Sequence, residues 1–160
     1  MTALPVAPHV CLPCRLGFAN LGLLAAHVQD AHVGQPTEPL VFDLPLPPNM
    51  LNGPSSRLHP VKKSFKQREY RAACDAVPAL PAPPAMPLTR ARLEITLRTS
   101  LAMDRDGAWA RCKWPLDWLV ARGYLRDDSP SVIGAPAFTA EKCKRSAAGV
   151  RLVLTPETPT

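Results

Sequence analysis

The segment ARLEITLRTSLAMDRDGAWARCKWPLDWLVARGYLRDDSPSV, residues 91–132, decides the fold of this chain of 160 residues. In its first part, residues 91–101, apolar and polar side chains alternate, so that Leu93, Ile95 and Leu97 share one face. Alternation with a period of two is typical of a strand with one buried face. The sequence therefore predicts a half-buried β-strand over residues 91–101.

A helix is predicted directly after this strand, over residues 107–122. Gly123 is well placed to end it, because glycine readily adopts the left-handed conformation that closes many helices. Pro115 has no backbone N–H and its ring clashes with the preceding turn, so we expect a kink or a helix that restarts near Trp114. Strand and helix together indicate an α+β fold.

The flanking segments add further elements. Downstream, residues 131–138 and 149–154 are predicted as two short strands that form a hairpin around a Lys-rich turn. Upstream, residues 40–48 (LVFDLPLPP) alternate like an edge strand that ends in prolines. Residues 64–77 indicate a basic helix whose first residue, a serine, could cap it. Residues 78–87 hold five prolines and are expected to form a stiff connector.

A metal-ligand pattern precedes these elements. Cys11-x2-Cys14-x12-His27-x4-His32 has the spacing with which two thiolates and two imidazoles bind zinc tetrahedrally. Four protein ligands leave no open position, so the zinc would be structural. The pattern resembles the Cys2His2 zinc-finger family, and the resemblance implies a small ββα unit.

The composition of this unit argues against base reading. The positions that usually contact bases in such fingers correspond to Asn20, Leu23 and Ala26, of which only Asn20 could pair with a base edge. One Arg and one Asp are the only charged residues between the first and last ligand. With Leu21 and Leu23 expected to be exposed, the unit is predicted to dock onto a protein partner or onto the domain that follows it in the chain.

Positive charge lies mainly behind this unit. The chain has 19 Lys and Arg against 13 Asp and Glu, a net charge of +6, which favours phosphate-bearing polymers as partners. We expect the basic helix to hold DNA phosphates, and the alternative is a solvated helix face. The candidate DNA-binding residues are Lys62, Lys63, Lys66, Arg68 and Arg71.

Four aspartates form the candidate catalytic cluster. Asp104 and Asp106 follow the strand, and Asp127 and Asp128 follow the helix, so they converge if the helix packs back on its strand. Two or three carboxylates with open water positions suit magnesium, which could then activate a water against a phosphodiester. The alternative is that these residues serve only as caps and surface turns. Lys113 lies on the helix between the two pairs, four residues before an aspartate with which it could form an ion pair.

The string MDRDGAWARCKWPLDWLVARGYLRDDSPSV, residues 103–132, resembles the RusA family of Holliday-junction endonucleases. Phage versions of that family carry D-x-D-N, then a Lys and an Asp on the next helix, then G-x-x-x-D-D. The segment DLPLPPNMLN, residues 43–52, is similar to the family's opening strand and proline-rich loop, so the resemblance covers about residues 40–154. This chain departs from the pattern at Gly107, where the family usually has Asn, and at Pro115.

The resemblance implies a mixed sheet flanked by helices, a homodimer and roles for five residues. Asp104, Asp106 and Asp128 would be the magnesium ligands, Asp127 a supporting acid, and Lys113 a cation that assists transition-state charge. The expected function is magnesium-dependent, structure-selective cleavage of Holliday junctions or other branched DNA. The alternative is a non-catalytic zinc-finger protein that binds branched DNA or regulates DNA recombination. A zinc-finger transcription factor is a third and weaker alternative.

The predicted organisation is a zinc finger at residues 1–33, a linker at 34–39, an endonuclease domain at 40–156 and a tail at 157–160. Five cysteines, an odd number, fit metal ligation better than a disulfide framework, and Cys74, Cys112 and Cys143 are expected to be plain thiols. No apolar run approaches the length needed to span a bilayer. We expect a protein of the cytoplasm, that of a bacterial host if the gene belongs to a phage.

Overall fold

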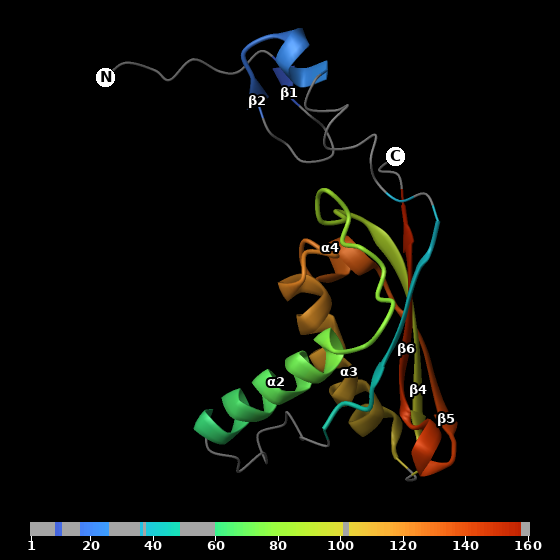
Figure 1. Cartoon of the computed structure of the whole chain (residues 1–160). Helices are drawn as coiled ribbons and strands as arrows, with labels where there is room; N and C mark the ends of the chain where they lie inside the picture. The colour runs from blue at the N-terminus through green and yellow to red at the C-terminus, as the bar shows by residue number, and fades with distance from the viewer. Residues whose placement is uncertain are drawn as a thin grey trace.

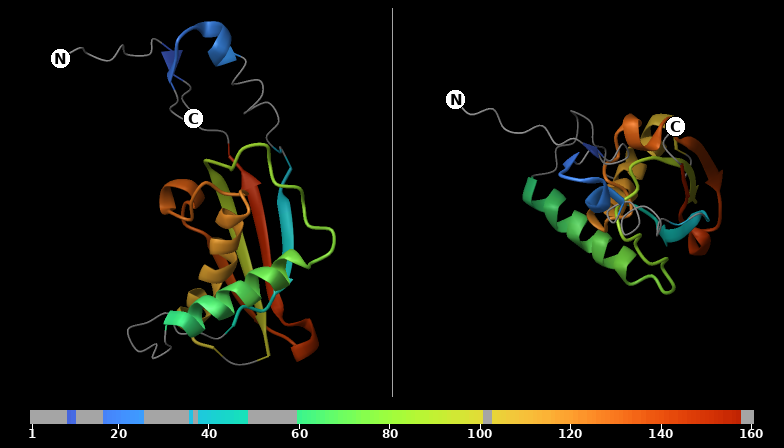
Figure 2. Two further views of the ribbon diagram at one scale, coloured as in Figure 1. Left: turned by 60° about the vertical axis from the view of Figure 1, so that its left-hand side comes forward. Right: turned by 90° about the horizontal axis from the view of Figure 1, so that it is seen from above.

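A mixed four-stranded sheet in the order β3-β6-β4-β5 carries the fold, and its helices α2, α3 and α4 lie on one side of it (Figures 1 and 2). The structure is a computed structural model that describes residues 9–10, 17–25, 36, 38–48, 60–100 and 103–157. Along the chain the elements of this part are β3 (Leu40–Pro45), α2 (Pro60–Asp75), β4 (Ala91–Thr99), α3 (Arg105–Ala121), α4 (Pro130–Ile133), β5 (Ala137–Lys142), the 3-10 turn η1 (Arg145–Ala147) and β6 (Gly149–Pro156).

As the sequence predicts, the alternation in β4 buries its apolar side chains on one face of the sheet. Leu93, Ile95 and Leu97 are at most 1% exposed, whereas their neighbours point to the other face. That other face carries charged side chains, and Asp43 of β3 accepts a hydrogen bond from Arg98 of β4 at 2.7 Å. The helices cover the apolar face of the sheet and the other face is polar, so apolar and polar residues alternate along β4.

The predicted hairpin between residues 131–138 and 149–154 is wrong. Residues 130–133 form the short helix α4 instead, with Pro130 at a first-turn position, where its missing N–H costs nothing. β5 pairs in parallel with β4, and β6 pairs antiparallel with both β3 and β4. The two strands are neighbours in sequence, yet β4 separates them in the sheet.

The two long helices differ in part from their predictions. α3 runs from Arg105 to Ala121 as one element through Pro115, so it does not restart near Trp114. Gly123 ends it, as predicted, with a φ of 77°. α2 begins at Pro60, so Ser64 lies within the helix and is not its cap.

Aromatic side chains fill the space between the helices and the sheet. Phe42 of β3 meets Trp118 of α3 and Tyr124 edge-on, at ring-centroid distances of 6.0 and 4.8 Å. Tyr70 of α2 meets Trp114 of α3 in the same way, at 6.1 Å. Because these rings come from separate elements, the core fixes α3 against the sheet and α2 against α3.

A polar clamp joins the last turns of α2 and α3. Asp75 Oδ1 accepts hydrogen bonds from Trp118 Nε1 at 2.8 Å and from Arg122 Nε at 2.6 Å. The hydrogen bond from Arg122, and after it the one from Trp118, lowers the pKa of Asp75 below its ordinary value. The clamp therefore favours the ionised form of the Asp75 carboxylate.

The described part of the N-terminal region is small. β1 (His9–Val10) pairs antiparallel with β2 (Gly17–Phe18), and a helical turn follows over residues 21–25. Asn20 Oδ1 accepts a hydrogen bond from Leu23 N at 2.9 Å, so its side chain caps this turn. As predicted, Leu21 and Leu23 are exposed, at 66% and 53%. The predicted zinc ligands Cys11, Cys14, His27 and His32 lie outside the described residues.

No helix within the described ranges is both long enough and apolar enough to cross a membrane.

Candidate active site

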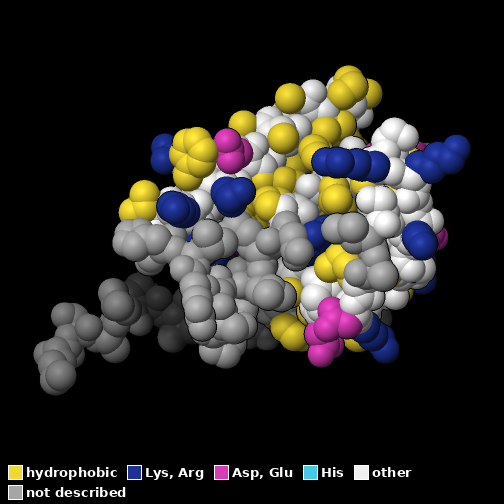
Figure 3. All heavy atoms as spheres, turned by 90° about the horizontal axis from the view of Figure 1, so that it is seen from below, with side chains coloured by type: hydrophobic (Ala, Val, Ile, Leu, Met, Phe, Trp, Pro, Cys, Tyr) yellow, Lys and Arg dark blue, Asp and Glu magenta, His cyan; other side chains and the backbone are white. Residues whose placement is uncertain are grey.

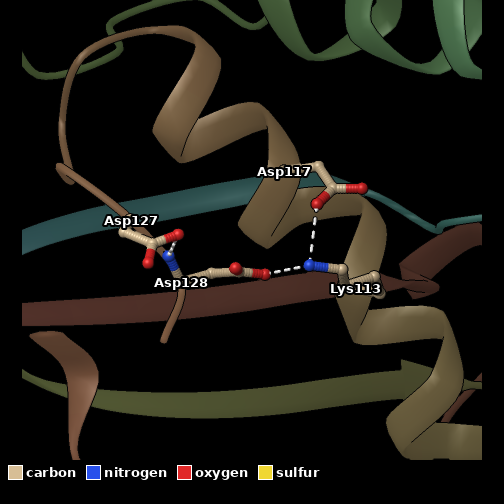
Figure 4. A network of polar contacts seen from close by, with 4 residues as sticks. All are labelled: Lys113, Asp117, Asp127 and Asp128. Atoms are coloured by element: carbon tan, nitrogen blue, oxygen red, sulfur yellow. Dashed lines mark hydrogen bonds and ion pairs between the residues drawn. The ribbon is translucent and has the colours of Figure 1, made fainter. Parts of the chain in front are cut away.

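Lys113 is the centre of a cluster of charged side chains on α3 and the loop after it (Figure 4). Its ammonium group donates a hydrogen bond to Asp128 and forms an ion pair with Asp117, whose carboxylate lies 3.1 Å away. The side chain of Lys113 is half-exposed, whereas those of Asp117 and Asp128 are largely covered. Two carboxylates therefore surround one positive atom at the protein surface.

The fold fixes both carboxylates in position. Asp117 lies one turn after Lys113 on α3, on the same face of the helix. Asp128 arrives on the loop behind Gly123, and this loop is anchored where Leu88 N donates to Tyr124 O and Arg126 N donates to Leu88 O, both at 3.0 Å. The reversal of the chain at Gly123 and this pairing bring Asp128 back along α3.

The charges of the cluster stabilise one another. The hydrogen bond to Asp128, followed by that to Asp117, raises the pKa of Lys113 above its ordinary value. Asp127 takes another role, since its Oδ1 accepts the backbone N–H of Asp128 at 2.9 Å. A hydrogen bond with Ser129, and then this backbone bond, lowers the pKa of Asp127. Asp127 thus shapes the loop that presents Asp128.

The structure does not bring Asp104 and Asp106 into this cluster. Asp104 precedes α3 and caps it, since its Oδ1 accepts the N–H of Gly107 at 3.0 Å. Asp106 lies exposed in the first turn, seven residues before Lys113, which corresponds to about 10 Å along a helix axis. In the described ranges, which include every aspartate predicted as a magnesium ligand, no three acids, histidines or cysteines are grouped to hold a metal ion. That ligand set stays a prediction.

Gly107 lies against the Asp104 carboxylate at the start of α3. A Cβ at this position would lie 2.5 Å from Asp104 Oδ1, so the Asp104 carboxylate would have to shift. Glycine therefore lets the Asp104 carboxylate lie close over the N-terminus of α3. This contact directs Asp104 toward capping the helix rather than toward Asp128.

A cavity of about 250 Å³ connects the cluster with the basic helix. It is lined by Lys63 and Gln67 of α2 and by Lys113, Trp114 and Asp117 of α3. The two α2 residues are four positions apart, so they share one face of that helix. Of the predicted DNA-binding residues, Lys63 is therefore the one that the structure places beside Lys113.

The other predicted DNA-binding residues of α2 are not among the residues that line this cavity. Lys62, Lys66 and Arg68 are exposed, and Arg71 is half-buried. On the face seen from below, the dark blue of Lys and Arg outweighs the magenta of Asp and Glu (Figure 3). The face seen in this view therefore carries more positively than negatively charged side chains.

A second cavity, of about 460 Å³, opens on the other side of Lys113. Its walls include Lys113 and Asp128, together with apolar residues of α3 and α4. Asp117 was not among the predicted site residues, although its spacing of four from Lys113 was a usable signal. Nothing in the sequence pointed to Gln67 or to the second cavity, because their neighbours come from separate elements.

The residues fit magnesium only in part. Asp117 and Asp128 direct two carboxylates at one cationic atom, and magnesium is commonly held by one or two carboxylates with water and substrate phosphate. Asp104 and Asp106 do not share this arrangement. A scan of the chain against protein-family models finds no matching family, and a search of curated proteins finds no matching relative.

Proposed function

We propose that the chain is a magnesium-dependent, structure-selective endodeoxyribonuclease that acts on branched DNA such as Holliday junctions. The observation that carries the proposal is the position of Lys113. It pairs with Asp117 and Asp128, and it shares a cavity with Lys63 of the basic helix α2. An acidic pair beside a basic surface offers a cation site and a phosphate site next to each other.

Each part of the cluster has a proposed role. Lys63 and the exposed cations of α2 hold backbone phosphates, which fixes the DNA without reading its sequence. Asp128 and Asp117 would hold magnesium, which would supply polarisation of the phosphodiester and activation of a water. Lys113, released from the carboxylates, is placed to neutralise the charge that develops on the cleaved phosphate.

Two ligand sets are open to experiment. The resemblance implies Asp104, Asp106 and Asp128, and the geometry favours Asp117 and Asp128, so Asp128 belongs to both sets. Asp106→Asn should abolish cleavage if the first set operates and leave it largely intact if the second does. Asp117→Asn should leave cleavage largely intact if the first set operates and abolish it if the second does.

The decisive assay incubates the full chain and magnesium with a synthetic four-way junction and measures nicking in each strand. Asp128→Asn should lower the cleavage rate about a hundredfold or more, the scale of losing one essential electrostatic group. Asp43→Asn is the matched control, because it removes an exposed carboxylate from the opposite face of the sheet. Absence of cleavage by folded wild-type protein, across magnesium and manganese, would refute the proposal.

The competing function is binding of branched DNA without cleavage. It is favoured by the pairing of Lys113 with both acids and by the separation of Asp104 and Asp106 from them. Tight junction binding by the same protein, with no product at any metal concentration, would establish this alternative.

Two further proposals concern assembly. A homodimer with two-fold symmetry would place two equivalent sites on opposing strands of a junction, and sedimentation of the free protein measures its mass. The N-terminal unit would bind one structural zinc and dock to a protein through the exposed Leu21 and Leu23.

A further inference from the structure

An exposed tryptophan borders the second cavity beside Lys113. Trp109 lies one turn before Lys113 on α3, is 41% exposed, and meets Phe138 of β5 edge-on at 5.6 Å. The other two tryptophans of the chain, Trp114 and Trp118, are at most 4% exposed. An accessible indole of this kind offers a large flat surface on which another ring can stack.

The cavity has the composition of a site for a flat aromatic ligand. Apart from Lys113, Asp128 and Ser129, its lining is apolar, with Trp109 on one side and residues of α4 such as Ile133 on the other. Its volume of about 460 Å³ lies within the range of small-molecule sites. The polar groups gather at the end where the candidate active site begins.

We infer that this cavity binds an unpaired nucleobase next to the phosphate that Lys113 contacts, with Trp109 as the stacking surface. The inference rests on the proposed function and adds a requirement for DNA with an unstacked nucleotide. Trp109 and Lys113 are four residues apart, about 6 Å along the helix axis, so a phosphate at Lys113 brings its own base to the tryptophan. Branch points supply such bases at low cost, because pairing and stacking are already weakened there.

A base site of this kind would select a DNA structure irrespective of its base sequence. Stacking on an aromatic ring tolerates every base, because each base has a π-face. A fully paired duplex keeps its bases stacked and cannot fill the cavity without first breaking a pair. The base site would therefore distinguish branched from linear DNA, while α2 binds both through phosphates.

The test compares two four-way junctions that carry the same number of phosphates, one intact and one abasic at the crossover nucleotides. Binding is measured in EDTA by anisotropy of a labelled strand, so that cleavage plays no part. Wild-type protein should bind the intact junction about five- to a hundredfold more tightly, the scale of stacking one base on an aromatic ring. Trp109→Phe should keep part of this ratio, and Trp109→Ala should reduce it to about one.

Tryptophan fluorescence provides an independent readout. Trp109 is the accessible indole, so the intact junction should quench emission in wild type more than the abasic junction does, and Trp109→Phe should lose this difference. An intact-to-abasic ratio near one in wild type, or a wild-type ratio in folded Trp109→Ala, overturns the base site. If the ratio holds but magnesium produces no cleavage, the base site stands and the proposed endonuclease activity fails. Cleavage without any base preference supports the endonuclease activity and overturns the base site.

Discussion

Replacing Asp75 by Ala should loosen the contact that holds the basic helix α2 against α3. Asp75 accepts hydrogen bonds from Trp118 Nε1 at 2.8 Å and from Arg122 Nε at 2.6 Å. Trp118 is 1% exposed, and its indole N–H has the Asp75 carboxylate as its acceptor in the folded protein. Leaving a buried donor without an acceptor costs about 1–3 kcal/mol.

The ion pair contributes less than this hydrogen bond. The side chain of Arg122 is 50% exposed, and an exposed pair contributes about 0–1 kcal/mol. We therefore expect Asp75→Ala to lower the free energy of unfolding by about 2 kcal/mol, and Arg122→Ala to lower it by clearly less, because solvent screens the exposed guanidinium. With an m-value of about 1.5 kcal/mol/M, the urea midpoint of Asp75→Ala should fall by about 1 M.

Urea unfolding followed by circular dichroism measures these midpoints. The buried hydrogen bond is responsible only if Trp118→Phe loses a similar free energy and the double variant with Asp75→Ala adds little to either single change. Equal losses in Asp75→Ala and Arg122→Ala would refute the reasoning, because they would assign the clamp to the exposed ion pair.

Acid should weaken the same clamp. Arg122 and Trp118 lower the pKa of Asp75, so its stabilising effect is complete above the unfolded value of about 3.9 and is lost as pH falls through the lower folded value. The stability difference between wild type and Asp75→Asn should therefore be constant near neutral pH and shrink below about pH 4. A difference that grows on acidification would contradict an ionised Asp75 in the folded state.

Three further predictions concern the site and the thiols. Gly107→Ala should be less favourable in wild type than in an Asp104→Ala background, because its Cβ displaces the Asp104 cap only when the cap is present, whereas the higher helix propensity of alanine, about 0.5–1 kcal/mol, acts in both. Lys63→Gln should reduce the slope of log binding constant against log salt by about one, whereas Arg92→Gln, on the open face of the sheet, should not. The five thiols comprise the buried Cys74 and Cys112, whose pKa values burial raises to about 11 and about 12, the half-buried Cys143, and the predicted zinc ligands Cys11 and Cys14. At neutral pH, zinc-loaded protein should show one thiol that alkylates fast, and protein treated with a chelator should show three. Three fast thiols in zinc-loaded protein would refute the zinc site.

The local sequence pattern alone was sufficient to predict features that depend on a single helix or strand. The period of two in residues 91–101 predicted β4 and its buried face, because a strand beside a core repeats that pattern in any fold. Gly123 was predicted to end α3, and residues 40–48 were predicted as an edge strand, since each depends on backbone preferences of a few residues. The strand predicted at residues 131–138 was wrong, because a short apolar run fits a helical turn and a strand equally well.

The sequence by itself determined an α+β chain with a mostly basic helix, an acidic loop at each end of a second helix, and a zinc-ligand pattern near the N-terminus. Only the tertiary structure decided which of these groups meet. Asp104 caps its own helix, whereas Asp128 returns along α3 to Lys113, because Gly123 reverses the chain and Leu88 anchors the loop. The packing of Tyr70 on Trp114 likewise joins α2 to α3, so that Lys63 borders the same cavity as Asp117. Such encounters depend on contacts between distant segments, which residue spacing along the chain does not encode.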